Sequence, residues 1–192
     1  MKALIIAPQP FFAPRGTPFS VYYRTLIMAE QGVDVDLLTY GHGDDVDLPR
    51  VRLIRIPRLA WLGAPPIGPS GIKACHDLVL AVWTIARLLR GRYDFVHAHE
   101  EAVFWCRYLK PIFRFKLVYD MHSSLPQQLG NFGFTRSRWM VALFEHLEHA
   151  ALRHADAVIT ICPDLERYAL DQGVPRDAHF LIENSIFDAV RL

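Results

Sequence analysis

Two histidines stand one residue apart at the end of an apolar run, in the segment Asp94-Phe95-Val96-His97-Ala98-His99-Glu100-Glu101. If this run is a β-strand, His97 and His99 point to the same side, because side chains alternate along a strand. Such a pair can ligate a metal with Glu100 or His122 nearby, although no further ligand cluster stands at a recognisable spacing. More often, histidines at a strand end form hydrogen bonds to a substrate hydroxyl or a loop carbonyl. Both interpretations predict a polar site at this strand end.

Asp120 and His122 follow the next apolar run, again two residues apart, in Leu117-Val118-Tyr119-Asp120-Met121-His122. At this spacing both side chains can face the same crevice. An imidazole there can orient sugar hydroxyls, and a neighbouring carboxylate can fix its tautomer. We therefore predict a functional role for His122 and a supporting role for Asp120, which otherwise ties down the following loop.

The loop from Pro8 to Gly16 is rich in proline and ends directly before a predicted helix. Free amides and the helix dipole attract anions at such a position, so Gly16 either lets the backbone approach a phosphate or sugar or serves only the turn. The loop contains neither G-x-G-x-x-G nor GxxxxGK[ST]. Binding of a nicotinamide or flavin dinucleotide is therefore disfavoured.

Short apolar runs alternate with longer amphipathic runs along the chain, which indicates strands separated by helices. This pattern predicts an α/β fold, a Rossmann-like doubly wound parallel sheet with helices on both faces. In the common strand order 3-2-1-4-5, ligands bind between the first and fourth strands at their carboxyl ends. The predicted strands are 3–7, 33–40, 51–56, 95–99, 116–119, 157–161 and 179–182, and the later helices are 72–90, 102–109, 138–154 and 163–170.

Local patterns also predict helix ends and buried faces. Thr17 is a plausible N-cap for the first helix, with Pro18 at its first position and Gly32 after its end. The segment 121–137 is predicted to be a long polar loop. The first helix is predicted to carry one apolar stripe, formed by Phe19, Tyr22, Tyr23, Leu26 and Ile27. In the second helix, the side chains expected mainly in the core are Leu78, Val79, Val82, Trp83 and Ile85.

Composition excludes several classes of protein. Hydrophobic residues make up 52% of the 192 residues, and 21 basic side chains balance 20 acidic ones. A folded domain is expected, and nothing suggests nucleic-acid binding. Three scattered cysteines and a short apolar N-terminus predict a cytoplasmic protein without a signal peptide. Peripheral contact with the cytoplasmic face of a membrane remains an alternative for the 72–90 helix, which is flanked by Lys73, Arg87, Arg90 and Arg92.

Five segments in the same order resemble the N-terminal half of the family 4 glycosyltransferases, which are retaining enzymes of the GT-B class. These segments read PRGTPFSVYYRTLIMAEQGVDVDLLTY, YDFVHAHEEAVF, LVYDMHSSLPQQL, ADAVITICPDL and LIENSIFDAV. The resemblance covers nearly the whole chain. It implies one half of a two-domain enzyme, in which the first domain binds mainly the acceptor and the second binds a nucleotide-sugar donor.

The resemblance also implies roles for single residues. His122 matches the family histidine near the transferred sugar, with Asp120 as its support, and Gly16 and Thr17 lie near the donor phosphate. The acceptor side is expected to include Arg15, His97, His99 and Glu100. Thr17 departs from relatives with a second glycine there, and Glu183-Asn184-Ser185 departs from their Pro-Asn-Gly.

The resemblance further implies that residues 1–183 form the Rossmann-like domain and that residues 184–192 begin an interdomain linker. No pair of glutamates has the eight-residue spacing of the family's donor domain. We expect the donor domain to be absent and the chain to be inactive without it or without a separate donor-binding subunit. The nucleotide-sugar is then a co-substrate, the acceptor is a sugar or a lipid-linked sugar, and no metal cofactor is expected.

Two other classes of function stay open from the sequence. One is a metal-dependent hydrolase that uses His97, His99 and His122. The other is a non-catalytic module that binds a glycan or docks on a catalytic partner.

Overall fold

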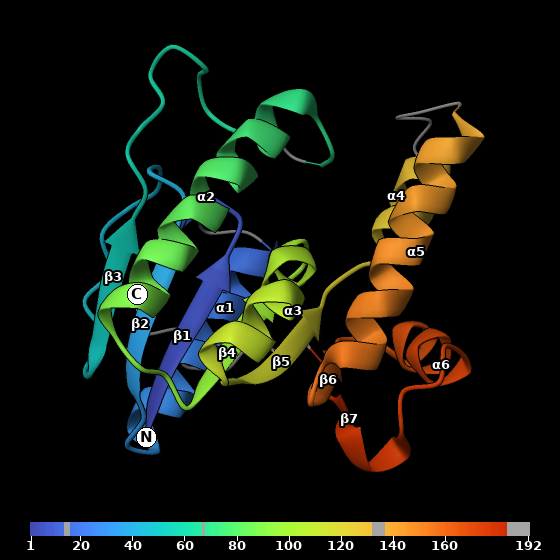
Figure 1. Cartoon of the computed structure of the whole chain (residues 1–192). Coiled ribbons are helices and arrows are strands. Elements are labelled where there is room, and N and C mark those ends of the chain that lie inside the picture. Colours follow the sequence, from blue (N-terminus) through green and yellow to red (C-terminus); the bar gives the residue numbers. More distant parts are fainter. Residues whose placement is uncertain (14–15, 67, 132–136, 184–192) are drawn as a thin grey trace.

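Seven parallel strands form one sheet in the computed structural model of the chain, which describes residues 1–13, 16–66, 68–131 and 137–183 (Figure 1). The order across the sheet is β3-β2-β1-β4-β5-β6-β7. The strands are β1 (Lys2–Ala7), β2 (Asp34–Thr39), β3 (Val51–Arg55), β4 (Phe95–His99), β5 (Lys116–Met121), β6 (Ala157–Thr160) and β7 (His179–Leu181). The helices are α1 (Gly16–Glu30), α2 (Gly71–Arg90), α3 (Ala102–Phe113), α4 (Leu125–Asn131), α5 (Arg138–His154) and α6 (Pro163–Asp171), with a 3₁₀ turn at Arg176–Ala178.

The predicted Rossmann-like α/β fold is confirmed, including the reversal of strand order between β1 and β4. β1 pairs with β2 on one side and with β4 on the other, so the loops that leave β1 and β4 diverge at their carboxyl ends. Ile5 of β1 lies beside His97, and His99 lies beside Asp120 of β5. This register brings the polar strand ends of β4 and β5 together.

Helices cover both faces of the sheet and divide its core in two. Leu80 of α2, Cys106 of α3 and Leu152 of α5 pack with Leu4 and Val96 on one face. On the other face, α1 lies behind the sheet in Figure 1 and packs Val21 against Ile5, Leu37 and the buried Phe12. β1 is covered on both faces, and its residues from Ala3 to Ala7 are all apolar and buried.

The first helix differs from the prediction at its start and in its buried face. It begins at Gly16, so Thr17 is a helical residue and not the N-cap. The buried residues of α1 include Pro18, Val21, Thr25 and Ala29, while Ile27 is exposed. The predicted stripe is confirmed only in part: Phe19 and Tyr22 are half-buried against the core beside Phe12, whereas Ile27 is exposed.

The segment 121–137 is not a continuous loop, because α4 occupies Leu125–Asn131. Leu125 and Leu129 are buried, and Glu148 of α5 accepts hydrogen bonds from Ser124 Oγ (2.7 Å) and from the Leu125 N–H (3.0 Å). Glu148 is fully buried, although it lies on a helix with several exposed polar side chains. A short helix of this kind lacks the repeated apolar period by which longer helices are recognised.

The second helix buries a different face from the predicted one. His76, Leu80, Thr84 and Leu88 point into the core at intervals of four residues. Three of the side chains expected mainly in the core, Leu78, Val82 and Ile85, are exposed instead. None of the helices in the described ranges is both long enough and apolar enough to span a bilayer.

Candidate functional site

Asp120, a fully buried carboxylate at the end of β5, is surrounded by three histidines. His97 Nε2 donates to Asp120 Oδ2 at 2.8 Å, and His99 Nδ1 lies 3.4 Å from the same oxygen. His122 Nε2 lies 3.2 Å from Oδ1 and also 3.2 Å from His99 Nδ1. The prediction that His97 and His99 share one side of β4 is confirmed, because their rings stack with centroids 4.7 Å apart.

Arg24 of α1, the helix that covers this face of the sheet, completes the cluster. Its Nε lies 2.8 Å from Asp120 Oδ2, and both side chains are almost entirely buried. The guanidinium comes from α1, so it links the first helix to the end of the fifth strand. Removing one partner of such a buried ion pair is strongly destabilising, by about 3–5 kcal/mol.

The electrostatics of the cluster favour a charged carboxylate and a neutral His99. Burial alone would raise the pKa of Asp120, but His99 and His122 and the hydrogen bonds from His122 and His97 hold that pKa well below its usual range. Burial lowers the pKa of His99 well below its usual value, against the opposing attraction of Asp120. A neutral imidazole has one donor and one acceptor nitrogen, which suits recognition of a hydroxyl group.

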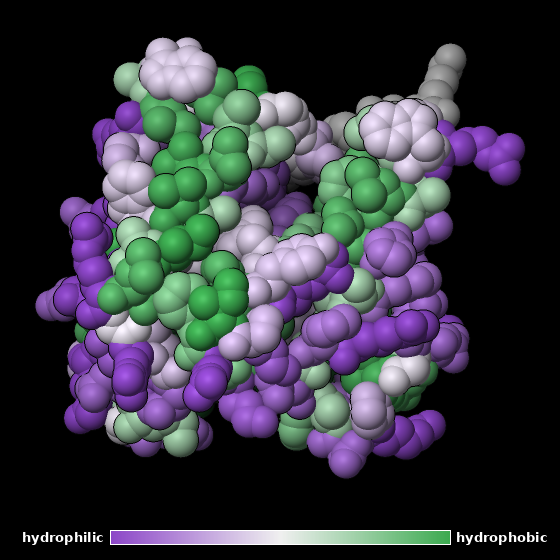
Figure 2. All heavy atoms as spheres, in the orientation of Figure 1, coloured by the Kyte–Doolittle hydropathy of each residue, from purple (hydrophilic) through white to green (hydrophobic). Residues whose placement is uncertain are grey.

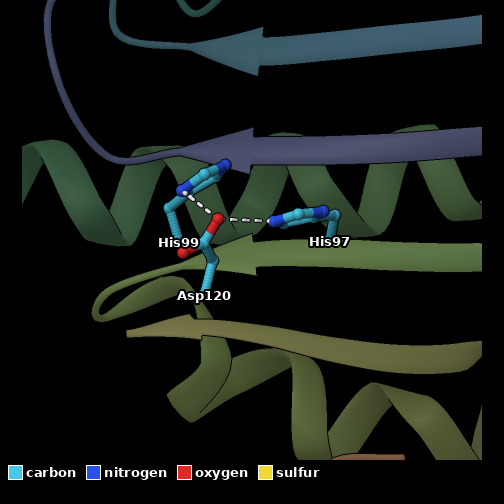
Figure 3. Close-up of side chains that lie close together, drawn as sticks. All are labelled: His97, His99 and Asp120. Carbon is cyan, nitrogen blue, oxygen red and sulfur yellow. Dashed lines mark hydrogen bonds and ion pairs between the residues drawn. The ribbon is translucent and has the colours of Figure 1, made fainter. Parts of the chain in front are cut away.

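His97, His99 and Asp120 lie together at the carboxyl ends of β4 and β5 (Figure 3), and their three ligand atoms lie within 4.8 Å of one another. They are joined by hydrogen bonds and ion pairs. A tetrahedral metal site with bonds of about 2.0–2.2 Å keeps its ligand atoms roughly 3.3 Å apart, farther than the 2.8 Å between His97 Nε2 and Asp120 Oδ2. The cation of Arg24 also occupies the neighbourhood of the shared oxygen. This geometry suits a hydrogen-bonded support better than a metal centre.

A pocket of about 290 Å³ opens where the loops after β1, β4 and β5 meet. Gly16 and Thr17 at the start of α1, Glu100 after β4 and Ser123 after β5 all line it. A Cβ added at Gly16 would meet no atom within 4 Å, so the space beside this helix end is open. The first turn of α1 therefore presents its backbone to a ligand.

Glu100 sits at the turn out of β4 in an uncommon conformation. Its φ of 46° lies in the left-handed region, and its N–H donates to Asp120 O at 3.1 Å. That region costs a non-glycine residue on the order of 1 kcal/mol or more. Burial, and repulsion from Glu101, raise the pKa of Glu100 to about 7. Near neutral pH this carboxyl group can therefore accept or donate a hydrogen bond at the pocket.

A second polar group lines the same pocket from α2. Lys73 Nζ lies 2.8 Å from Glu101 Oε2 and 3.3 Å from Asp77 Oδ2, and Tyr40 Oη donates to Asp77 Oδ1. Burial would lower the pKa of Lys73, but Glu101 and Asp77 raise it above its usual value. Burial raises the pKa of Asp77 to about 6, although Lys73 opposes this. This wall of the pocket is therefore charged, but the positive charge of Lys73 is offset by the carboxyl groups of Glu101 and Asp77.

The residues predicted from the sequence fall into three groups. Gly16, Thr17 and Glu100 line the pocket, and Ser123 next to His122 does so too. His97, His99, Asp120 and His122 are buried and contact one another, and none of the four is among the residues that line the pocket. Arg15 and the linker 184–192 lie outside the described residues.

Other residues of the site were missed by sequence reasoning. Arg24, Lys73, Asp77 and Tyr40 come from helices and strands far away in the chain, and no short motif connects them with the strand ends. The loop aromatics Phe11 and Phe12 are buried in the core and do not line the pocket, while Trp61 is exposed.

Comparison with known families identifies the family to which this chain belongs. The family model described as glycosyl transferase 4-like domain matches residues 26–185, most of the chain. The chain belongs to this family. No curated protein matches the sequence of this glycosyl transferase 4-like domain at a significant level.

Solved structures of similar fold are GT-B glycosyltransferases. Sucrose-phosphate synthase from Thermosynechococcus elongatus superposes with a TM-score of 0.67 at 18% identity, over 96% of this chain and 48% of that one. HepE of Anabaena, in complex with UDP-glucose, superposes with a TM-score of 0.58 at 16% identity, over 97% of this chain and 44% of that one. The glycosyl transferase 4-like domain thus spans about half the length of these two proteins.

Proposed function

We propose that this domain is the acceptor-binding half of a retaining glycosyltransferase, which moves a sugar from a nucleotide-sugar donor to an acceptor hydroxyl. The observation that carries the proposal is the single pocket shared by the loops after β1, β4 and β5, with the open amino end of α1 on one side and Glu100 on the other. This is the place where ligands bind in open parallel sheets. The domain match and the GT-B structures at half coverage support the same function.

In the proposed reaction, negative charge develops on the leaving diphosphate and needs fixed donors nearby. The free amides and dipole of α1 at Gly16 and Thr17 supply such a field without a metal ion. His122, held by Asp120 and His99, orients hydroxyls of the transferred sugar. Its Nδ1 is buried without a hydrogen-bond partner among the described residues, and the next residue, Ser123, lines the pocket.

The acceptor side is formed by Glu100, Glu101 and Lys73. Because Lys73 is already paired with Glu101 and Asp77, this wall offers no free cation for an anionic acceptor group. Carboxyl groups instead suit the hydroxyls of a sugar, either free or lipid-linked. His97 and His99 act in this proposal as positioning residues, since His97 contacts Asp120 and His99 contacts both Asp120 and His122.

A second domain, on the same polypeptide or on a separate subunit, is proposed to bind the nucleotide and to close over the pocket. Closure excludes water, which otherwise hydrolyses the donor.

A metal-dependent hydrolase is the alternative that the cluster of His97, His99 and Asp120 raises. The direct hydrogen bond between two of the three ligand atoms and the nearby Arg24 argue against it. Elemental analysis of protein purified without chelator separates the two functions. Stoichiometric zinc or manganese that disappears in the His97→Ala variant would favour the hydrolase.

The proposal is tested by amide NMR of the isotope-labelled protein during titration with a panel of methyl glycosides and nucleotide-sugars. We expect glycosides to shift the signals of Gly16, Thr17, Glu100 and Ser123, with weakened binding in Glu100→Ala. The control variant Glu145→Ala, on the exposed part of α5, should bind like the parent protein. Ligand shifts confined to other surfaces would contradict the proposed acceptor site.

A further inference from the structure

Helix α2 carries an apolar face that no described part of the chain covers. Of its residues, all of which the structure describes, no exposed one before Arg90 is charged. The side chains Ile72, Cys75, Leu78, Val82, Ile85 and Leu89 form this face, which we call the α2 stripe. Leu78 and Leu89 expose 68% and 72% of their surface. At 1.5 Å per residue the stripe is about 26 Å long.

Figure 2 shows this stripe as a hydrophobic band along α2 on the surface. Isolated exposed apolar side chains are ordinary, whereas contiguous apolar patches mark binding surfaces. α2 packs into the core through its opposite face, which carries Leu80, Thr84 and Leu88. The side chains of the stripe therefore take no part in the core. The stripe is therefore an excess of apolar surface beyond what the fold itself requires.

Basic side chains gather at the C-terminal end of the same helix. Arg90, Arg92 and Arg114 surround a hollow of about 830 Å³ together with Leu89 and Ile112, which is itself 69% exposed. None of the three arginines forms an ion pair with a carboxylate in the described ranges. The one acidic side chain in the hollow, Asp94, accepts a hydrogen bond from the backbone N–H of Lys2. An apolar band thus ends in unpaired positive charge.

We propose that the α2 stripe and these arginines form a docking surface for an anionic lipid bilayer, with α2 lying in the plane of the membrane interface. Apolar side chains of such a helix enter the boundary between headgroups and acyl chains, and arginines beside them pair with anionic headgroups. A protein partner would need acidic groups placed against all three arginines. A bilayer with anionic lipids provides both chemistries over the whole length of the stripe.

This orientation connects the surface to the pocket, although the membrane inference does not rest on the proposed function. Lys73, in the first turn of α2, lines the pocket, and the arginines stand at the other end of the helix. With α2 on the bilayer, the pocket opens beside the membrane surface. A hydroxyl carried by a membrane-bound acceptor would then reach the pocket without leaving the bilayer.

The test is flotation of the purified protein with vesicles of phosphatidylcholine alone and of phosphatidylcholine with 30% phosphatidylglycerol. We expect binding to the anionic vesicles that weakens in 0.5 M NaCl, because exposed charges are then screened. The double variant L78Q/L89Q should bind at least ten-fold more weakly. Removing one arginine near an anionic surface lowers the affinity for the membrane about five-fold, so R90E/R92E should bind vesicles at least about 25-fold more weakly.

Matched controls change equivalent side chains elsewhere. I27Q/F180Q removes two exposed apolar side chains from α1 and β7, and R167E/R176E makes the same change in net charge. Both should bind vesicles like the parent protein, and circular dichroism should report equal folding in all variants. Equal binding of L78Q/L89Q and I27Q/F180Q would overturn the proposal. A second result would also overturn it: the parent protein does not bind vesicles but forms a dimer in solution, and L78Q/L89Q dissociates this dimer. The stripe would then bind a second copy of the chain.

Discussion

At the scale of single residues, Asp120 joins three segments of the chain. It receives contacts from His97 and His99 of β4, from His122 after its own strand and from Arg24 of α1. The sequence predicted the pair of His97 and His99, a functional His122 and a supporting Asp120. Arg24 could not be predicted, because the partner of a buried charge is set by how α1 packs on the sheet and not by local spacing.

Asp120→Asn should lower the free energy of unfolding by about 3 kcal/mol, because it leaves the Arg24 guanidinium buried without a counter-charge. Chemical denaturation at pH 7 measures this. The native pKa of Asp120 lies well below its unfolded value. Its stabilisation is therefore complete above about pH 4 and declines as the pH falls further.

Asp34→Asn is the matched control for this prediction. Asp34 pairs with Arg50 at 2.8 Å, but both side chains are at least half exposed. Exposed ion pairs contribute about 0–1 kcal/mol. If both variants lost the same free energy of unfolding, the buried ion pair with Arg24 would not be the reason that Asp120 stabilises the fold.

At the scale of helices and strands, pattern reasoning located almost every element and misjudged several surfaces. The seven predicted strands match the seven observed ones, because buried parallel strands are short continuous apolar runs bounded by turns. Helix faces were less predictable. In α2, apolar residues occur on both sides, and only packing on the sheet decided that Leu80 is buried and Leu78 exposed.

Glu148 illustrates how a helix is fastened by one buried side chain. It accepts hydrogen bonds from Ser124, the Leu125 N–H and Tyr168 Oη, so it joins α5 to the start of α4 and to α6. Glu148→Ala should cost about 2–4 kcal/mol, since three donors lose their acceptor. Thermal denaturation and amide hydrogen exchange of α4 measure the effect.

The control for this helix is Glu145→Ala, three residues earlier on the exposed side of α5. It should change stability by no more than about 0.5 kcal/mol. Unchanged exchange in α4 of the Glu148→Ala variant would mean that α4 is held by its leucines alone.

At the scale of the whole molecule, the pocket lies at the edge of the sheet where β1, β4 and β5 end. We propose that this edge faces a second domain. The chain spans about half the length of the sucrose-phosphate synthase it resembles in fold. We expect these 192 residues alone to transfer no sugar from UDP-, ADP- or GDP-sugars, because the proposed donor-binding half is supplied elsewhere. Radiolabelled transfer to a panel of sugar acceptors measures this, and robust turnover by the isolated chain would contradict the division of labour.

The sequence by itself determined the order of elements, the parallel sheet and the strand ends at which polar side chains gather. These features depend on local period and on short-range rules of chain connection, which a sequence carries directly. Only the tertiary structure decided that Arg24 reaches Asp120, that Glu148 is buried and that one face of α2 stays exposed. Each of these depends on which surfaces of distant segments meet, and that is set by close packing across the sheet and not by neighbours in the chain.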